Sequence, residues 1–349
     1  MVRAGGKAMT KMKTIFVIIF LALLIPVLLA APESEAKVYR GKCKSNLTWS
    51  YDSKTKTMVI DCKGDMPDDE QFYDLDMGWR KYYFKTKKVI FKKGISSIGA
   101  GAFYNFQKLE EVVLPEGLRI IKYDAFDGCR KLQFINKPST LEVIEKDVFW
   151  DVKIKSISLK NLKKLGSECF SGAKLQSVDI PAKCKIEDSV FWSCKKLKKV
   201  TFEKGVKRIS YGMFRETGIK NIDIPGSVAQ IGTYAFANCQ SLKKAIINEG
   251  VKKISKDAFS NTALEEITIP STVTQLGKNA FRWDFTEKSS LKKVVIRSKN
   301  IKKWGTMVFG ATRDDLVIYV PQSKKAEYEK ILRSTNGLDF HAKIVGKKW

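Results

Sequence analysis

Few residues of this chain are of the types that carry out chemistry, and their spacing does not bring them together. The 349 residues include seven cysteines and one histidine, His341. No Cys-x-x-Cys pair or Cys/His cluster is present, so no metal site is predicted. Adjacent carboxylates such as Glu110–Glu111 point to opposite sides of an extended chain and cannot flank one bond. Without a Ser/His/Asp set or a glycine-rich phosphate loop, we predict no enzyme, no catalytic residue and no cofactor.

The cysteine spacing indicates burial rather than cross-linking. Cys129, Cys194 and Cys239 each lie three residues after a phenylalanine that recurs about every 22 residues. In a stacked structure with coils roughly 4.8 Å apart, they fall in one column, with roughly 14 Å from Cys129 to Cys194 and roughly 10 Å from Cys194 to Cys239. A disulfide needs Cα atoms within about 7 Å, so these thiols are expected to be free and buried. Only Cys43 and Cys62, which flank a predicted hairpin, are candidates for a disulfide.

The recurring phenylalanine belongs to the pattern I-x-x-I-x-x-x-A-F. The phenylalanine of this pattern occurs ten times, at Phe103, Phe126, Phe149, Phe170, Phe191, Phe214, Phe236, Phe259, Phe281 and Phe309. A fixed period of this length is typical of a solenoid, in which each repeat adds one coil and neighbours share a continuous core. Alternating segments such as residues 264–270 are expected to form a parallel sheet on the concave side. Short turns or helical segments, with the A-F turn among them, are expected on the convex side.

The ends of the chain depart from the repeat. Residues 1–36 combine basic residues, an apolar run from Ile15 to Leu29 and small residues, the layout of a signal peptide. An uncleaved anchor is the alternative, although an apolar run interrupted by Pro26 is short for a membrane span; after cleavage no transmembrane span is expected. Residues 37–94 are expected to form an N-terminal hairpin and aromatic cap, or alternatively a sugar platform. Residues 95–321 form the repeats and 322–349 a C-terminal cap with a helical segment.

The chain is strongly basic. Its formal charge is +27, and the predicted leader contributes four basic and two acidic residues, which leaves +25. Such a charge favours acidic partners, but no nucleic-acid motif accompanies it, so no specific nucleic acid is expected. The basic doublets recur in every second repeat, at Lys207-Arg208, Lys252-Lys253 and Lys302-Lys303. Two coils span roughly 10 Å, about one Debye length, so this alternation limits self-repulsion along a basic stripe. Plain solubility is the competing explanation.

Two candidate ligand sites follow from the repeat. Strand positions that point away from the core form columns on the sheet face, and we predict ligand contacts there from Lys199, Asn221, Asp223, Lys244, Glu266 and Lys293. A solvated face is the alternative. The repeat after Phe281 carries an insertion with Arg282, Trp283 and Phe285, which indicates either a binding loop or a packed loop.

The repeat residues also carry a family resemblance. The phrase Ile231-Gly232-x-x-Ala235-Phe236-x-x-Cys239-x-x-Leu242 resembles the BspA-type leucine-rich repeat, over roughly residues 43 to 335. The resemblance implies a secreted or cell-surface protein, often an adhesin that binds host or matrix proteins, with a protein or acidic polysaccharide as partner. The alternative is a structural envelope protein held by charge on anionic wall polymers. The oligomeric state stays open, with a monomer favoured.

Overall fold

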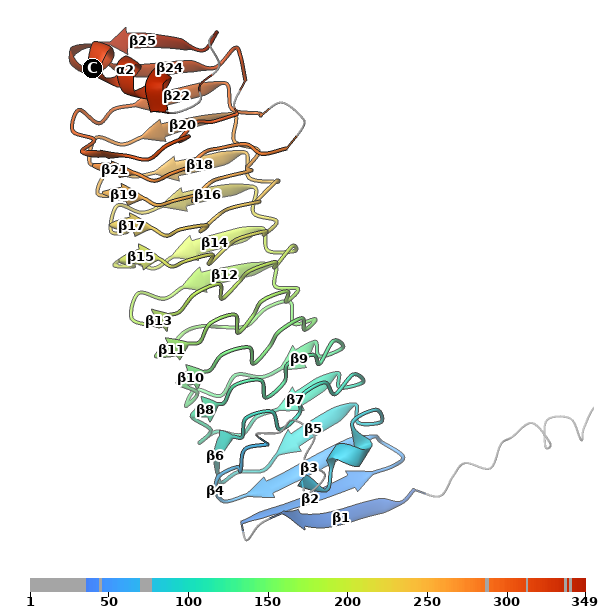
Figure 1. Ribbon diagram of the computed structural model, residues 1–349. Helices are drawn as coiled ribbons and strands as arrows, with labels where there is room; N and C mark the ends of the chain where they lie inside the picture. Colours follow the sequence, from blue (N-terminus) through green and yellow to red (C-terminus); the bar gives the residue numbers. More distant parts are fainter. Residues whose placement is uncertain are drawn as a thin grey trace, which may run out of the picture.

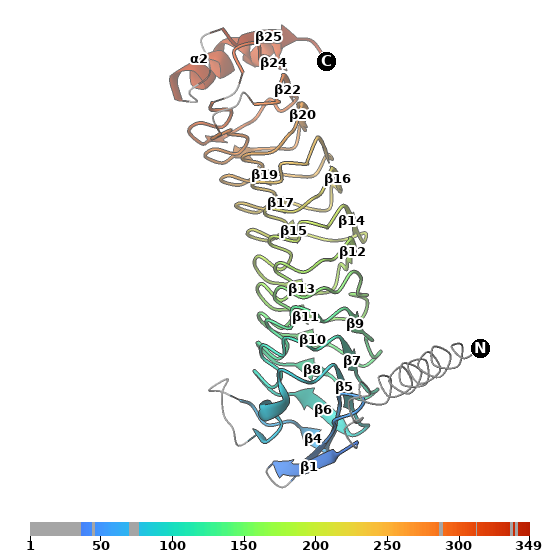
Figure 2. The ribbon, with the colours of Figure 1, turned by 90° about the vertical axis from the view of Figure 1, so that its right-hand side faces the viewer.

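The computed structural model describes residues 36–43, 46–69, 77–285, 289–311, 313–335, 338 and 341–349. It is a parallel β-solenoid of about 11 turns, drawn out into a long, gently bent column (Figures 1 and 2). Most coils contribute one strand of two to five residues to a first side, one usually shorter strand to a second side, and the A-F turn to a third; the coil around residues 152–160 has no strand on the first side. These sides are called the long-strand face, the short-strand face and the turn face. The predicted leader, residues 1–36, lies outside the described residues except for Ala36.

The long-strand face is the parallel sheet that the sequence predicts. Its strands are β5 (Lys88–Phe91), β7 (Glu111–Val113), β9 (Phe134–Ile135), β12 (Ser177–Ile180), β14 (Lys199–Phe202), β16 (Asn221–Ile224), β18 (Lys244–Ile247), β20 (Glu266–Ile269), β22 (Lys293–Ile296) and β24 (Val317–Pro321). Side chains alternate along each strand. In β16, Ile222 and Ile224 are buried, whereas Asn221 and Asp223 are exposed. The core is therefore lined by every second residue.

The short-strand face carries a second parallel ladder in place of the expected turns and helical segments. Its strands are β4 (Gly64–Asp65), β6 (Ile95–Ile98), β8 (Ile120–Ile121), β10 (Val143–Ile144), β11 (Lys164–Leu165), β13 (Lys185–Ile186), β15 (Arg208–Ile209), β17 (Gln230–Ile231), β19 (Lys253–Ile254), β21 (Gln275–Leu276) and β23 (Lys303–Trp304). Most have only two residues, one outward and one inward. Such short strands still pair in register from coil to coil.

The phenylalanines form one continuous stack through the column. Neighbouring rings of the ten repeats lie 5.1–6.0 Å apart, centroid to centroid, and within 18° of parallel. The stack extends into the N-terminal cap, where the buried Trp79 lies 6.1 Å from Phe103. This confirms the single aromatic spine that the period predicts.

Backbone hydrogen bonds tie each A-F turn to the next coil. The amide of Phe236, for example, donates to the carbonyl of Ala258 at 2.8 Å. In most repeats the residue two positions after the phenylalanine adopts the left-handed conformation, as at Asn238, where φ is 59°. Asn, Asp and Gly tolerate this conformation best, which explains why these residue types recur at that position.

The predicted cysteine column is confirmed. The thiols of Cys129, Cys194 and Cys239 are buried and free, and each donates to the carbonyl of the repeat phenylalanine one coil earlier, at 3.0–3.2 Å. Burial raises the pKa of Cys194 to about 12 and that of Cys239 to about 11. These thiols act as small core side chains with one weak hydrogen bond.

The two ends of the column are closed by different elements. Strands β1 (Val38–Cys43), β2 (Leu47–Asp52) and β3 (Thr57–Cys62) form an antiparallel meander, and β5 adds to β3 in parallel. The short 3₁₀ helix η2 (Arg80–Tyr82) lies nearby. At the other end, η3 (Gln322–Lys324) and α2 (Lys325–Thr335) follow β24, and β25 (Lys343–Lys347) pairs with β24. The expected helical segment is thus confirmed as α2, anchored by the buried Tyr328 and Leu332.

The expected disulfide is not formed. The thiol of Cys43 donates to the sulfur of Met77 at 3.6 Å, and that of Cys62 donates to the carbonyl of Asp65 at 3.7 Å. The chain reverses direction between Cys43 and Leu47, so Cys43 lies on β1 and Cys62 on β3, each opposite Leu47 of β2. Two strand spacings separate them by roughly 10 Å, beyond the reach of a disulfide.

No helix in the described part of the chain is both long enough and apolar enough to cross a bilayer.

Candidate functional site

The six sheet-face residues predicted as ligand contacts all lie exposed on the long-strand face. Lys199 is on β14, Asn221 and Asp223 on β16, Lys244 on β18, Glu266 on β20 and Lys293 on β22. Asn221 lies beside Lys244, and Glu266 lies beside Lys293, in direct register. The structure therefore places them along one face; of the six, Lys244 and Glu266 line a common pocket of about 320 Å³.

Ion pairs reduce the positive charge of this face. The ammonium of Lys293 lies 3.1 Å from the carboxylate of Glu266. Near the N-terminal end, Lys88 and Glu111 form an equivalent pair at 2.9 Å. Asp223 accepts a hydrogen bond from the side-chain amide of Asn248 at 2.6 Å. Among the described residues, Lys199 and Lys244 have no carboxylate within 4 Å, so the column keeps two unpaired cations.

The short-strand face carries a more regular array. Lys207, Arg208, Lys252, Lys253, Lys302 and Lys303, which we call the basic ladder, occupy or precede β15, β19 and β23. Arg208, Gln230, Lys253, Gln275 and Lys303 are successive partners in the parallel register. None of the six cations has a carboxylate within 4 Å in the described part of the chain. The alternation is thus confirmed in space from β15 to β23, with roughly 10 Å between basic strands, whereas Lys164 and Lys185 on β11 and β13 are direct neighbours in register.

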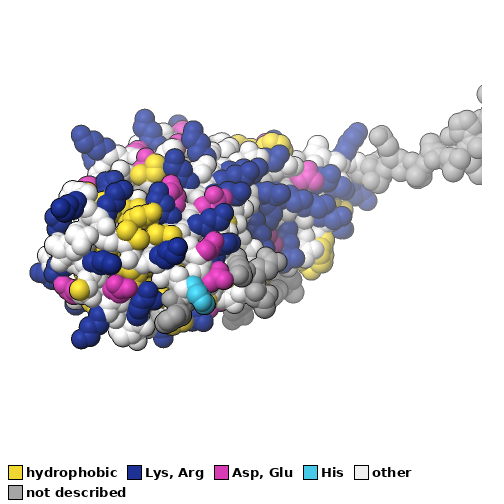
Figure 3. Space-filling model, turned by 90° about the horizontal axis from the view of Figure 1, so that it is seen from above, with side chains coloured by type: hydrophobic (Ala, Val, Ile, Leu, Met, Phe, Trp, Pro, Cys, Tyr) yellow, Lys and Arg dark blue, Asp and Glu magenta, His cyan; other side chains and the backbone are white. Residues whose placement is uncertain are grey.

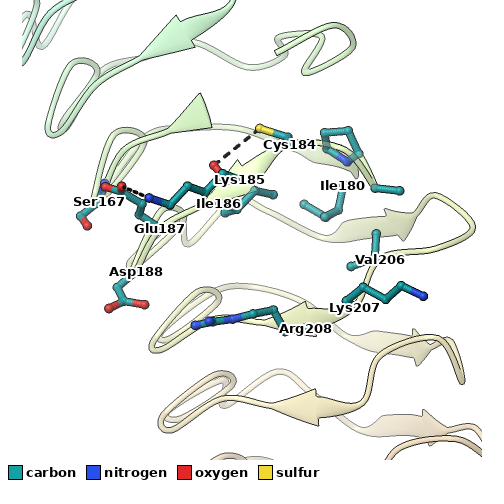
Figure 4. Close-up of a pocket in the computed structure, with 12 residues that line it drawn as sticks. Ser167, Ile180, Cys184, Lys185, Ile186, Glu187, Asp188, Val206, Lys207 and Arg208 are labelled. Carbon is teal, nitrogen blue, oxygen red and sulfur yellow. Dashed lines mark hydrogen bonds and ion pairs between the residues drawn. The ribbon is translucent and has the colours of Figure 1, made fainter. Parts of the chain in front are cut away.

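A pocket of about 390 Å³ opens at the N-terminal end of the basic ladder. Figure 4 shows Arg208 and Lys207 on one side of it and Lys185 and Glu187 on the other, with Ile180 and Val206 nearby. Glu187 lies 3.5 Å from Lys185 and 3.3 Å from Lys164, and this pairing contributes to a pKa below the usual range for its carboxyl.

The pocket has a sequence cause. Three residues before the short-strand isoleucine, neighbouring repeats bury a valine, such as Val206 and Val228. The repeat before Phe191 has Lys183 at this position, and its side chain is exposed. Its neighbour Cys184 is only half-buried, and burial raises the pKa of its thiol to about 11. A missing core side chain therefore leaves a gap between two coils.

The insertion loop after Phe281 is packed along its described part. Arg282 lies 2.6 Å from Asp284, and the amide of Trp283 donates to the carbonyl of Gly310 at 3.2 Å. The rings of Trp283 and Phe285 meet edge to face at 5.2 Å. Trp283 is half-buried, whereas Phe285 keeps 45% of its surface exposed. Residues 286–288 lie outside the described residues.

Within the residues that the structure describes, no group of three or more His, Cys, Asp and Glu side chains lies close enough to hold a metal ion.

Comparison with known families decides the class of this solenoid. The family model described as "BspA type Leucine rich repeat region" matches residues 81–196 and 163–286, with six copies of the repeat. The chain belongs to this family. A search among curated proteins finds no match.

Solved structures support the fold of this BspA-type repeat protein. A leucine-rich repeat protein from Bacteroides ovatus is 24% identical, with a TM-score of 0.62, over 79% of this chain and 70% of that one. Another, from Eubacterium ventriosum, is 20% identical, with a TM-score of 0.57, over 81% of this chain and 84% of that one. At this level of identity the likeness concerns the fold.

Sequence reasoning found the basic doublets but missed the pocket beside them. The pocket could have been found from Lys183, which stands at a repeat position that is a buried valine in neighbouring repeats. A lysine at such a position turns to the solvent and removes a side chain from the interior.

Proposed function

We propose that this BspA-type repeat protein is exported to the cell surface or secreted, and that it binds acidic segments of other proteins through the basic ladder. The predicted leader supports export. The observation that carries the proposal is the register of the ladder: six cations with no carboxylate nearby recur on one face of a rigid frame. Unpaired cations that are held in fixed positions attract an anionic partner and also orient it.

The spacing of the ladder suits an extended peptide. Basic strands recur every two coils, or roughly 10 Å. A polyproline II segment advances about 9.3 Å in three residues, so an acidic residue at every third position meets each basic strand. The pocket at the N-terminal end provides apolar surface from Ile180 and Val206 beside Arg208, where one larger side chain of the partner can bind. An acidic polysaccharide is the competing ligand.

The test compares two variants with the same charge change on different faces. The ladder variant is R208Q/K253Q/K303Q, and the control is K199Q/K244Q/K293Q on the long-strand face. Binding to a peptide with glutamate at every third position is measured by calorimetry at low and moderate salt. Three exposed ion pairs contribute about 1–2 kcal/mol in total, so the ladder variant is expected to bind about 5- to 30-fold more weakly.

The outcomes separate the alternatives. Loss in the ladder variant alone supports the proposal. Equal loss in both variants shows that only net charge matters, and no peptide binding at low salt refutes the proposal. Heparin binding that depends on the ladder, without peptide binding, assigns the face to an acidic polysaccharide.

A second candidate is a structural envelope protein held on anionic wall polymers. The observation that favours it is the wide spread of charge: Figure 3 shows Lys and Arg distributed over the visible surface, with fewer acidic residues, and the formal charge is +27. Because such retention is electrostatic and screened by salt, release of the protein from cells by high salt supports this candidate. Binding to purified matrix proteins supports the first.

A further inference from the structure

The turn face carries a notch between two tryptophans. Trp150, Ser171 and Trp192 each directly follow the repeat phenylalanine of three successive coils. The middle coil has only Ser171 and Gly172 where its neighbours have larger side chains. A pocket of about 380 Å³ lies here, lined by both tryptophans, by Ser171 and Gly172, and by the charged side chains of Asp151, Lys174 and Lys195. Two coils separate the tryptophans by roughly 10 Å, which leaves room for a ring between or across them.

Of the two tryptophans, Trp192 packs against a neighbouring cation, whereas Trp150 is an exposed ring. Trp150 is 37% exposed. The guanidinium of Arg215, on the coil after Trp192, lies 5.5 Å from the centroid of the Trp192 ring and 5.7 Å from that of Tyr234. The indole nitrogen of Trp192 is buried and has no hydrogen-bond partner among the described residues. Fixed aromatic surfaces bind a ligand at low entropic cost.

Cations gather beside the notch without the alternation of the basic ladder. Four residues after the phenylalanine, four successive coils carry Arg130, Lys153, Lys174 and Lys195. Asp151 lies 3.2 Å from Arg130 and 3.6 Å from Lys174. In the described part of the chain, Lys153 and Lys195 have no carboxylate within 4 Å. Cations on adjacent coils repel one another, so an anionic group bound here relieves this repulsion.

The notch continues into a polar groove. Lys195 also lines a second pocket of about 500 Å³ that reaches Phe285, together with the amides of Asn238, Gln240 and Asn261 and the carboxylate of Glu216, which pairs with Arg215 at 3.3 Å. The side-chain amide of Asn261 donates to that of Asn238 at 3.0 Å. We call the two pockets together the aromatic groove. It spans six coil spacings, or roughly 29 Å, with aromatic side chains at both ends and hydroxyl and amide groups between them.

We propose that the aromatic groove binds an acidic oligosaccharide. The C–H face of a sugar ring packs on Trp150 and Trp192, and its carboxylate accepts a hydrogen bond from the ammonium group of Lys195, since Asp151 already pairs with Lys174. A sugar chain fits better than an apolar peptide, since polar groups line most of the groove and hydroxyls can satisfy them. The groove lies on a different face from the basic ladder, so this proposal does not depend on the proposed function.

The experiment measures binding of three acidic oligosaccharides: tetragalacturonate, a hyaluronan tetrasaccharide and sialyllactose. Neutral chitotetraose is the control ligand. Calorimetry gives the affinity, and tryptophan fluorescence reports contact. The variants are Trp150→Ala, Trp192→Ala and Lys195→Gln. The controls are Phe134→Ala, which removes an aromatic ring 62% exposed on the long-strand face, and Lys253→Gln on the basic ladder.

We expect saturable binding and fluorescence quenching with at least one acidic oligosaccharide. The affinity is expected to be at least tenfold weaker for each groove variant and unchanged for both control variants. Trp150→Phe keeps a ring and is expected to lose less affinity than Trp150→Ala, which separates ring contact from misfolding. The proposal is overturned if none of the three acidic ligands binds, if chitotetraose binds equally well, or if Lys253→Gln weakens binding as much as Lys195→Gln.

Discussion

Removal of one ring from the middle of the aromatic spine is expected to be severe. Phe236 is fully buried, with its ring 5.4 Å from that of Phe214 and 5.1 Å from that of Phe259. Phe→Ala substitutions in cores cost about 3–5 kcal/mol. Since each coil contacts only its neighbours, no other contact compensates for two interrupted stacking interactions. We therefore expect Phe236→Ala to lower the free energy of unfolding by about 4–5 kcal/mol.

The measurement is urea unfolding followed by circular dichroism, with Phe134→Ala as the matched control. Phe134 is 62% exposed, so its removal is expected to change the free energy of unfolding by less than about 0.5 kcal/mol. A loss below about 1.5 kcal/mol for Phe236→Ala, or a loss equal to that of the control, refutes the idea that the spine stabilises the column.

Two further predictions concern ionisable groups. Burial, together with the charges of Asp124 and Asp147, raises the pKa of Asp127 to about 7; the folded protein then keeps a proton that the unfolded chain loses near pH 4, so the free energy of unfolding falls as pH rises from about 4 to 7. Thermal unfolding at pH 5.5 and 8 is expected to show this fall, and Asp127→Asn to reduce it; an unchanged pH dependence in the variant counts against the assignment. Cys184 is the most accessible thiol of the repeats, since the cysteine column is fully buried. Ellman's reagent is expected to modify Cys184 first, and Cys129, Cys194 and Cys239 only on unfolding. Rapid labelling of a repeat cysteine that persists in a Cys184→Ser variant contradicts this.

The period of the phenylalanines was sufficient to predict the stack and the burial of Cys129, Cys194 and Cys239, because one apolar residue per coil fixes the register of every residue at the same position of the repeat. The short-strand face could not be predicted in the same way. A two-residue strand such as Arg208–Ile209 is too short to show an alternating pattern, and only pairing with the next coil makes it a strand.

The same distinction applies to the candidate sites: features that repeat with the coil could be predicted, whereas contacts between particular residues of different coils could not. The basic doublets were visible in the sequence since they keep the phase of the repeat. The ion pair between Lys293 and Glu266 was not, because it depends on which residues become neighbours across coils. The disulfide prediction was wrong for a related reason: it took Cys43 and Cys62 as the ends of a two-stranded hairpin, whereas a third strand separates them.

The two periods of this protein differ, and the difference constrains how it can change in length. The core repeats with every coil, whereas the charges of the basic ladder repeat with every second coil. Duplication of one coil leaves the interior intact but breaks the alternation: it sets either two basic strands or two glutamine strands side by side, roughly 5 Å apart. Duplication of a pair keeps both patterns. Relatives that gain or lose repeats and retain this surface are therefore expected to do so by even numbers.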